Sequence, residues 1–493
     1  MTGFKRSLKP KLMFDQRPVI YVIGLLVMAL GSAMLVPMLL DLSDGHDNWQ
    51  AFALSAFMTV LLGGGAALSC QNADHHLNIQ QTFILTTGVW LIMPIFAAIP
   101  FIIGAPSVDF TNAFFEAMSG MTTTGATVFT GLEDMPRGVL LWRGMLQWFG
   151  GIGVVVVAMV FLPVLRVGGM QIFRTEGFDT FGKILPRAAE ISRSVSQIYL
   201  GLTLICFIAY SMAGLGAFDA IVHAMTTIAT GGFSNYDRSF AELGAGAEYV
   251  GTIFMLLAAL PFVRYIQLIS GGGEALWRDP QVRGFFTVAI VVVLVLLLWR
   301  VVFVTSDTEL AFRKALFNGV SILTGTGYAS DNYMRWGSFA VTVFFFIGLI
   351  GGCAGSTTCS IKGFRFQLLF ASVLTQIRRI QTPSGIFEPR YAGRRVAEDV
   401  ISSVMAFFMM FMVSLAVISV LLSFSGLDLL TSMSGASAAL ANIGPGLGDV
   451  IGPAGNYESL NDFAKWVLAL AMLVGRLELM AVFVLLTGAF WRG

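Results

Sequence analysis

Long apolar segments recur along the whole sequence, and they limit the possible folds more than any other feature does. The first runs from Pro18 to Leu40, and several others also reach the roughly 20 residues that a helix needs to cross a bilayer. Of the 493 residues, 56% are hydrophobic and only 12% are charged, whereas soluble domains carry about 25% charged residues. The sequence therefore predicts an all-α integral membrane protein whose partner on most sides is the lipid bilayer.

Composition and motifs exclude several classes of function. The net charge of +1 predicts no nucleic-acid partner. No Walker motif and no GxGxxG after a strand is present, so we expect this chain to bind no nucleotide itself. No span combines Ser with His, pairs two Asp residues or contains HExxH, which disfavours an intramembrane enzyme. The cysteines form no CxxC pattern and are predicted to be buried free thiols; they are Cys70, Cys206, Cys353 and Cys359.

One unit occurs four times after two leading spans: a long helix, a short half-apolar helix, a glycine-rich loop and a second long helix. The leading spans are expected at about 18–40 and 50–70. The paired spans of the units are expected at about 81–104 with 138–165, 195–214 with 247–270, 284–304 with 337–352, and 398–424 with 463–490. The chain thus divides into an N-terminal two-helix segment, 1–75, and four repeats, 76–190, 191–280, 281–395 and 396–493.

The short helices of the four units are predicted to enter the membrane and turn back. Each covers only about 10–14 residues, which is too short to cross a bilayer. Non-helical backbone at membrane depth is tolerated only where it is buried in protein or lines a watery cavity. Four such loops in one chain therefore predict one shared axial cavity.

Basic residues orient this topology. They cluster in the N-terminal tail and in the connectors from Arg166 to Arg193, Arg278 to Arg283 and Lys362 to Arg395. By the positive-inside rule these faces are cytoplasmic, so both termini are expected in the cytoplasm. Acidic residues fall in the loops of the other side; they are Glu133, Asp134, Asp237, Glu242, Asp307, Asp331 and Asp449.

The four loops can be aligned on one glycine each. Their sequences are TTGAT, ATGGF, GTGYA and NIGPG, and the aligned glycines are Gly125, Gly231, Gly327 and Gly444. The residues in front of them are Thr123 and Thr124, Ala229 and Thr230, Gly325 and Thr326, and Asn442 and Ile443.

This pattern suits a filter for a monovalent cation. A dehydrated K⁺ must exchange its water shell for oxygens, and glycine allows the dihedrals that turn successive carbonyls inward. The C-terminus of each short helix carries partial negative charge toward the cavity. No acidic side chain lies in the five-residue cores, whereas divalent-selective pores more often use Asp or Glu rings. The alternative is that each glycine is only a helix-breaking turn.

The loops also resemble those of a known family. GTGYA is similar to the V-G-Y-G core of potassium-channel filters. The segments TTTGAT, TIATGGFSNYD, LTGTGYA and ANIGPG resemble the Trk/Ktr/HKT superfamily of potassium transporters, over nearly the whole chain. The two extra leading spans are similar to the TrkH/TrkG branch rather than to the shorter KtrB branch.

The resemblance implies potassium uptake across the bacterial inner membrane. It implies a homodimer in which each protomer has its own pore, together with cytosolic nucleotide-binding subunits of the TrkA type. Serine at the first filter glycine goes with Na⁺ transport in the related HKT proteins, so Gly125 implies K⁺ preference. The fourth loop departs from the pattern, because Ile443 replaces Thr and Pro445 follows Gly444. A gated channel and a symport coupled to H⁺ or Na⁺ both remain open.

The second span of the third unit is interrupted by GGCAGSTTCS, residues 351–360. One interpretation is a helix kink in which hydroxyl groups satisfy freed backbone groups. The other is a flexible intramembrane loop beneath the filter, and the resemblance implies that a loop here acts as the gate. The gate candidates in it are Gly351, Gly352, Gly355, Ser356, Thr357 and Thr358.

Arg476 lies in the second span of the fourth unit. A charge at that depth is expensive and usually faces a cavity or a partner. Arg476 either faces the pore or forms an ion pair, for which Glu478 is a candidate although residues two apart do not face each other on a helix. The resemblance implies an arginine in the pore below the filter that raises the barrier to cations.

Other charged residues have two interpretations each. Glu116 and Asp219, on the first two short helices, are structural caps or ion-attracting groups at the mouth, and a cap is favoured for Asp219. Lys362 either touches the gate or is an ordinary lysine at the cytoplasmic edge, the commoner case. The connector from Arg378 to Arg395 is a docking face or an ordinary basic anchor.

A secondary transporter for a small organic solute is the second candidate function, with broken helices forming a site at the midplane. It requires two opposed repeats, whereas the four units here run in the same sense.

Overall fold

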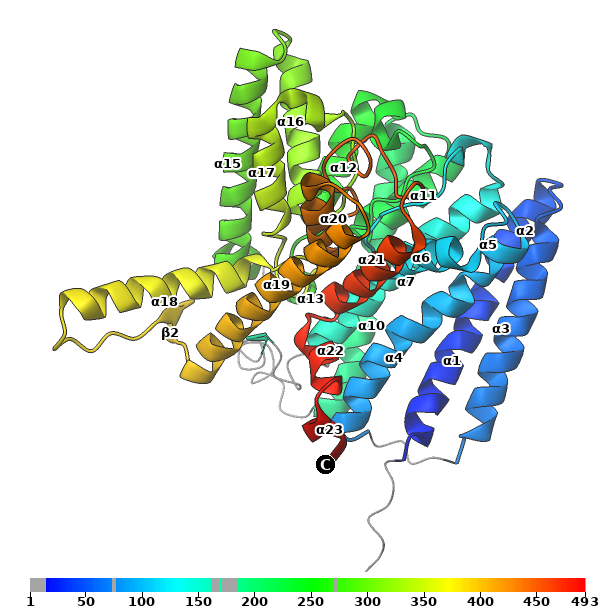
Figure 1. Ribbon diagram of the computed structural model, residues 1–493, viewed down its shortest axis with the longest axis horizontal. Helices are drawn as coiled ribbons and strands as arrows, with labels where there is room; N and C mark the ends of the chain where they lie inside the picture. Colours follow the sequence, from blue (N-terminus) through cyan, green and yellow to red (C-terminus); the bar gives the residue numbers. More distant parts are fainter. Residues whose placement is uncertain are drawn as a thin grey trace, which may run out of the picture.

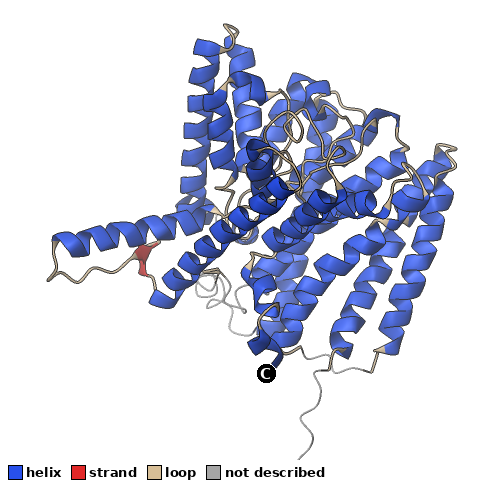
Figure 2. Ribbon diagram, viewed as in Figure 1, coloured by secondary structure: helices blue, strands red, loops and turns tan. Residues whose placement is uncertain are grey.

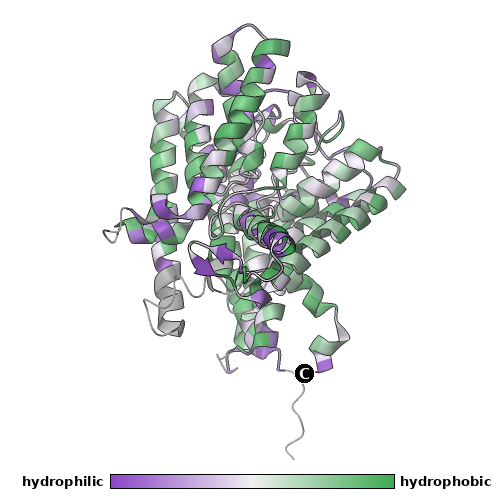
Figure 3. Ribbon diagram, turned by 90° about the vertical axis from the view of Figure 1, so that its left-hand side faces the viewer, coloured by the Kyte–Doolittle hydropathy of each residue, from purple (hydrophilic) through white to green (hydrophobic). Residues whose placement is uncertain are grey.

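A computed structural model describes residues 15–72, 77–160, 168–170, 184–269, 271 and 274–492. Within these ranges the chain is almost entirely helical, apart from an antiparallel pair of short strands, β1 (Arg390–Tyr391) and β2 (Arg394–Arg395), with Arg390 opposite Arg395 (Figure 2). The helices are largely hydrophobic along their lengths, and the two strands are hydrophilic (Figure 3). Seven of the described helices, or eight if one bent pair counts as a span, are long and apolar enough to cross a membrane. The predicted all-α membrane fold is confirmed.

The two leading spans form a tight pair. Helix α1 (Arg17–Ala33) continues into α2 (Leu35–Ser43), and α3 (Trp49–Ser69) packs along α1 (Figure 1). Glycines allow the close approach, since a side chain on Gly63 would lie 2.6 Å from the backbone nitrogen of Met28 and 2.8 Å from the carbonyl oxygen of Gly24.

Each of the four units contains a long helix, a short helix, a loop and a second apolar segment, which is broken in three of the units. The first unit consists of α4 (Ile79–Ala97), α5 (Ile99–Ile103), α6 (Phe110–Met121), the 3-10 turn η1 (Leu132–Asp134) and α7 (Arg137–Val160). The second consists of α10 (Ile184–Met212), α11 (Ala217–Ile228), η3 (Ser239–Glu242), α12 (Gly244–Ala258) and α13 (Phe262–Ile269). The third consists of α14 (Ala275–Arg278), α15 (Pro280–Phe303), α16 (Thr308–Leu323), η4 (Tyr333–Trp336), α17 (Ser338–Gly348) and α18 (Gly363–Gln381). The fourth consists of α19 (Glu398–Phe424), α20 (Leu429–Ala441), α21 (Asp462–Arg476), α22 (Met480–Leu485) and α23 (Gly488–Arg492).

The short helices α6, α11 and α20 have 12, 12 and 13 residues, within the expected range, but α16 has 16. The extra turn of α16 is polar and is capped by Asp307, whose carboxylate accepts a hydrogen bond of 3.1 Å from the N–H of Leu310.

The second spans of three units are broken: the interruption predicted at 351–360 is present, and the spans predicted as continuous at 247–270 and 463–490 are broken as well. A bend of 88° separates α12 from α13, next to Pro261. Helix α17 ends at Gly348, and residues 349–362 are not helical. Helix α21 ends at Arg476, and Glu478 and Leu479 then adopt positive φ angles of 55° and 53°. Hydropathy does not detect the breaks in the second and fourth units, because most residues around them are apolar or small.

The breaks in α12–α13 and after α17 meet and satisfy each other's backbone. The N–H of Cys353 donates to the carbonyl of Ala259 over 3.0 Å, and the N–H of Phe262 donates to the carbonyl of Gly355 over 2.9 Å. Because unpaired backbone groups are costly inside a membrane, each break depends on the other.

Some of the basic residues used to orient the chain lie outside the described residues, namely those in 1–14, 161–167 and 171–183.

The packing of α1 on α3 gives a test of the fold. Gly63→Val should lower the apparent melting temperature of the detergent-solubilised protein, since overpacking a close helix contact costs about 1–3 kcal/mol. Gly65→Val is the matched control, because a side chain on the exposed Gly65 meets nothing within 4 Å. Equal melting temperatures for the two variants would show that the α1–α3 contact is not as close as described.

Candidate functional site

The four short helices end in the same backbone turn. At the C-terminal end of each helix one residue adopts a positive φ angle, and the residue two positions later also has a positive φ angle. The first positions are Thr123 (52°), Thr230 (49°), Gly325 (71°) and Asn442 (51°), and the second are Gly125 (83°), Gly232 (81°), Gly327 (85°) and Gly444 (100°). The residue between them donates its N–H to the carbonyl five residues earlier, in the pairs Thr124–Ser119, Gly231–Thr226, Thr326–Ser321 and Ile443–Ala438, at 2.8–2.9 Å.

This geometry corrects the alignment of the second loop by one residue. The glycine equivalent to Gly125 is Gly232, not Gly231, and Ala229 is the last residue of the helix turn rather than part of the loop core. The sequence ATGGF contains adjacent glycines, so either can be aligned, and only the backbone conformation distinguishes them.

The equivalent triplets are therefore Thr123-Thr124-Gly125, Thr230-Gly231-Gly232, Gly325-Thr326-Gly327 and Asn442-Ile443-Gly444.

The four loops pack against one another in a closed ring. A side chain built on any of the four equivalent glycines would overlap a carbonyl oxygen of the next loop. The pairs are Gly125 with Gly231, Gly232 with Thr326, Gly327 with Ile443, and Gly444 with Thr124. Loop one thus contacts loop two, two contacts three, three contacts four, and four returns to one. The ring brings together main-chain oxygens from segments more than three hundred residues apart in sequence.

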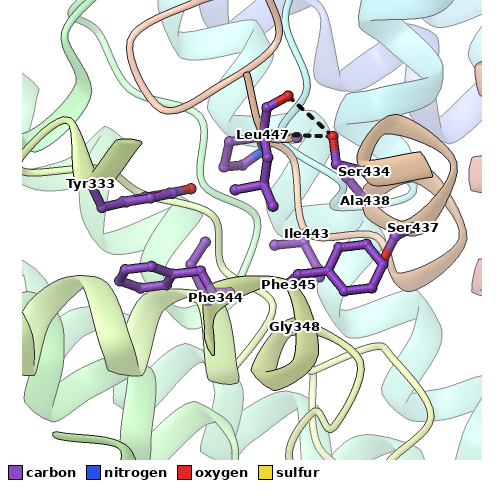
Figure 4. A pocket seen from close by; sticks show the side chains of 12 residues that line it. Tyr333, Phe344, Phe345, Gly348, Ser434, Ser437, Ala438, Ile443 and Leu447 are labelled. Carbon is purple, nitrogen blue, oxygen red and sulfur yellow. Dashed lines mark hydrogen bonds between the residues drawn. The ribbon is translucent and has the colours of Figure 1, made fainter. Parts of the chain in front are cut away.

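A cavity of about 240 Å³ opens on one side of the ring. All four glycines, Gly125, Gly232, Gly327 and Gly444, line it together with residues of the outer loops, including Thr127, Asp237 and Tyr457. A much smaller cavity of about 20 Å³ lies off the ring, between α17 and α20 (Figure 4). There Ser434 accepts from the N–H of Leu447 over 2.8 Å and donates to its carbonyl over 3.2 Å, which fixes the chain that follows Gly444.

The first residues of two of the triplets carry side-chain oxygens without partners within the described ranges. Thr123 Oγ1 and Asn442 Oδ1 are buried and have no hydrogen-bond partner among the described residues. The amide nitrogen of Asn442 is used, since it donates to Thr124 Oγ1 and to the carbonyl of Met472, both over 2.9 Å. Two buried oxygens without donors are suited to a cation.

Residues 349–362 form a loop that touches the ring. The N–H of Ser360 donates to the carbonyl of Ala441, at the C-terminus of α20, over 3.1 Å. The hydroxyl of Thr230 donates to the hydroxyl of Thr357 over 3.3 Å. The loop therefore contacts units two and four next to the ring triplets, and its non-helical backbone favours a loop over a kinked helix.

Arg476 is buried, with 3% of its surface exposed. Its guanidinium contacts Cys359 of the 349–362 loop, donates to the carbonyl of Gly150 on α7 over 3.0 Å, and lies 5.5 Å from the ring centre of Trp90. Glu478 is not its partner, so the ion pair considered from the sequence is absent.

Glu478 instead binds two basic residues next to the loop. Its carboxylate lies 3.3 Å from Lys362 Nζ and pairs with Arg365, which also donates to the carbonyl of Gly168 over 2.8 Å. Lys362 is 5% exposed and paired with a carboxylate, so it is not a solvent-exposed lysine of the ordinary kind. The cluster ties the end of the loop to the chain break that follows Arg476.

Glu116 and Asp219 also differ from the simple cap. Glu116 is fully buried and pairs with Arg143 over 2.8 Å. Asp219 caps no helix, because its carboxylate accepts from Asn235 Nδ2 over 2.8 Å and from the hydroxyl of Tyr236 over 3.0 Å. Both carboxylates therefore hold the chain around the ring.

Sequence reasoning missed two side chains that touch ring carbonyls. Gln147 of α7 donates to the carbonyl of Gly231 over 2.6 Å, and the hydroxyl of Tyr457 donates to the carbonyl of Gly444 over 2.7 Å. One signal was available: Arg143 and Gln147 stand four residues apart in a mainly apolar span, as polar residues on one helix face do.

Comparisons with known proteins agree on one family. The sequence model of the TrkH family, described as a cation transport protein, matches residues 48–492. The Trk system potassium uptake protein TrkI of Halomonas elongata is 42% identical over 483 residues, covering 96% of this chain and 97% of that protein. The Trk system potassium uptake protein TrkH of Escherichia coli K12 is 35% identical, covering 97% and 99%.

A solved structure also matches. The crystal structure of the potassium transporter TrkH from Vibrio parahaemolyticus aligns with a TM-score of 0.91 at 33% identity, covering 97% of this chain and 100% of that one.

The buried Glu478 cluster gives a test of stability. Glu478→Gln leaves Lys362 and Arg365 without a counter-charge, and breaking a buried pair costs about 3–5 kcal/mol. Its melting temperature in detergent should therefore fall well below that of Glu274→Gln, the control, in which the lost partner Arg278 is exposed. A Glu478→Gln protein as stable as the control would mean that the cluster does not hold the loop.

Proposed function

Because the chain belongs to the TrkH family of cation transport proteins, we propose that it takes up potassium ions across the bacterial inner membrane through a filter made by its own four loops. The ring closure of the four glycines with neighbouring carbonyls carries this proposal, since a single axis surrounded by main-chain oxygens is what a dehydrated cation requires. Its relatives named as Trk potassium uptake proteins support K⁺ as the ion.

The filter residues are those of the four triplets. Backbone N–H groups of the middle residues bond back to the short helices, which leaves carbonyl oxygens for the ion. The C-termini of α6, α11, α16 and α20 lead into the ring and favour positive charge there. In the HKT relatives, serine at the position of Gly125 goes with Na⁺ transport. Glycine at this position therefore supports K⁺ preference.

The gate, in this proposal, consists of residues 351–360 and Arg476. The loop contacts Thr230 of the filter on one side and Arg476 on the other. A buried guanidinium raises the barrier to a cation that passes nearby. Movement of the loop would shift this guanidinium and so change the barrier. Gly351, Gly352 and Gly355 provide the freedom for that movement, with Ser356, Thr357 and Thr358 supplying hydroxyl partners in place of helix bonds.

We further propose that the protein is a homodimer with a pore in each protomer and with both termini in the cytoplasm. A cytosolic subunit of the TrkA type, rather than this chain, binds the regulatory nucleotide. Helix α18 and the β1–β2 hairpin project from the rest of the bundle (Figure 1) and carry a group of exposed basic residues suited to docking. These are Arg378, Arg379, Arg390, Arg394 and Arg395.

A solute transporter built on two opposed repeats fits less well, because the four units enclose one ring in chain order.

Substitution in the ring tests the filter. Cells that lack their own potassium uptake should grow on low K⁺ when they express the wild-type chain. Gly327→Ala should reduce uptake by roughly tenfold or more, because it adds backbone strain and overlaps the carbonyl of Ile443.

Gly244→Ala is the matched control, since Gly244 has φ of +81° against +85° at Gly327 but no atom within 4 Å of the added carbon. Equal uptake by the two variants at equal membrane levels would contradict a filter at Gly327.

Substitution of Arg476 tests the gate. Arg476→Ala should increase the initial rate of K⁺ uptake by roughly tenfold, the factor that corresponds to about 1.4 kcal/mol of lost electrostatic barrier. Arg476→Lys retains the charge and should stay close to the wild type. Unchanged or lower flux in an Arg476→Ala protein that still inserts and folds would refute the barrier.

A further inference from the structure

The second filter loop lacks an internal support that two of the other loops have. In loop one the hydroxyls of Thr122 and Thr124 bond to each other over 2.8 Å, and in loop three those of Thr324 and Thr326 do the same over 2.8 Å. The equivalent position of loop two is Gly231, which has no side chain. Its backbone must be held by something else.

The amide of Gln147 fills that space. Its nitrogen donates to the carbonyl of Gly231 over 2.6 Å, and its oxygen accepts from the N–H of Phe233 over 3.0 Å. A side chain on Gly231 would overlap this amide, which explains a glycine where the other loops have Thr or Ile. The two bonds span Gly232, so they fix the peptide groups on both sides of it.

The face of α7 that carries Gln147 makes further contacts with the same loop. It is fully buried on α7, and Arg143 lies one turn before it on the same face. Arg143 donates to the carbonyl of Ser234 over 2.9 Å, and its guanidinium lies 4.2 Å from the ring centre of Phe233. One face of a unit-one helix therefore holds the filter loop of unit two over four consecutive residues, 231–234.

We propose that Gln147 is a positioning residue that sets the cation selectivity of the filter by restraining the Gly231 carbonyl. This inference rests on the proposed function. The Gly231 oxygen belongs to the ring, because it is the atom that a side chain on Gly125 would overlap. An oxygen held at a fixed radius suits K⁺, whereas an oxygen free to move inward also coordinates the smaller Na⁺. Loss of the amide donor therefore weakens discrimination between the two ions.

The experiment measures selectivity rather than flux alone. Purified wild-type protein and variants are reconstituted in liposomes, and ⁸⁶Rb⁺ uptake is measured in competition with K⁺ and with Na⁺. Gln147→Met retains length and apolar bulk without either hydrogen bond, and Gln147→Glu retains the acceptor for Phe233 but loses the donor. Both should lower the K⁺/Na⁺ preference roughly fivefold or more, the effect expected of one or two lost buried hydrogen bonds.

Gln81→Met is the matched control. Gln81 is also buried, at 6% exposure, and its side chain bonds to Asn78 and Asp15 at the start of α4, with no filter contact. It should reduce stability without changing the K⁺/Na⁺ preference. If Gln147 has a purely structural role, its variants should likewise lose stability without a change in the K⁺/Na⁺ preference.

The outcomes separate the two proposals. Wild-type protein that does not transport K⁺ would overturn the proposed function. Wild-type protein that does, with Gln147 variants of unchanged K⁺/Na⁺ preference, would overturn only the role of Gln147. If Gln147→Met does not insert, the K⁺/Na⁺ preference is measured in Gln147→Glu and Gly231→Ala instead. The added methyl group of Gly231→Ala displaces the Gln147 amide from the side of the loop. A second readout needs no transport: it is the difference in melting temperature between detergent-solubilised protein in K⁺ and in Na⁺. We expect this difference to be smaller in each variant than in the wild type.

Discussion

Backbone that leaves a helix inside a membrane must still find hydrogen-bond partners, and this requirement organises the whole molecule. Each loop of the ring directs N–H groups back to the short helix before it, through bonds such as Thr124 to Ser119. The carbonyls are then the groups left to face the neighbouring loops, and glycine is needed wherever one loop meets the next. The ring is thus a consequence of satisfying donors locally while leaving carbonyl acceptors between the loops.

The same requirement explains why the helix breaks below the ring occur together. The bend next to Pro261 and the loop that follows Gly348 exchange backbone hydrogen bonds, and the break after Arg476 is tied to the end of that loop by Glu478. Any movement of the loop must therefore change the surroundings of Arg476. This coupling gives a physical basis for the proposed gate, which lies close to the proposed filter without being part of it.

The sequence predicted the membrane fold and the four-unit order, because long apolar spans and short helices have different lengths that hydropathy detects. It misplaced the second loop by one residue, since ATGGF offers two glycines and only the φ angles distinguish Gly232. It predicted the interruption at 351–360 but missed the breaks next to Pro261 and after Arg476, because most residues around them are small or apolar. It could not pair Glu478 with Arg365, or Gln147 with Gly231, because such contacts join residues far apart in sequence.

Anomalous diffraction from crystals grown in RbCl tests the central claim most directly, since Rb⁺ replaces K⁺ and can be located by its own scattering. The account predicts peaks on one axis, surrounded by the carbonyl oxygens of Thr124, Gly231, Thr326 and Ile443. An axis without Rb⁺ at that level, with the ion bound elsewhere in the protein, would contradict it.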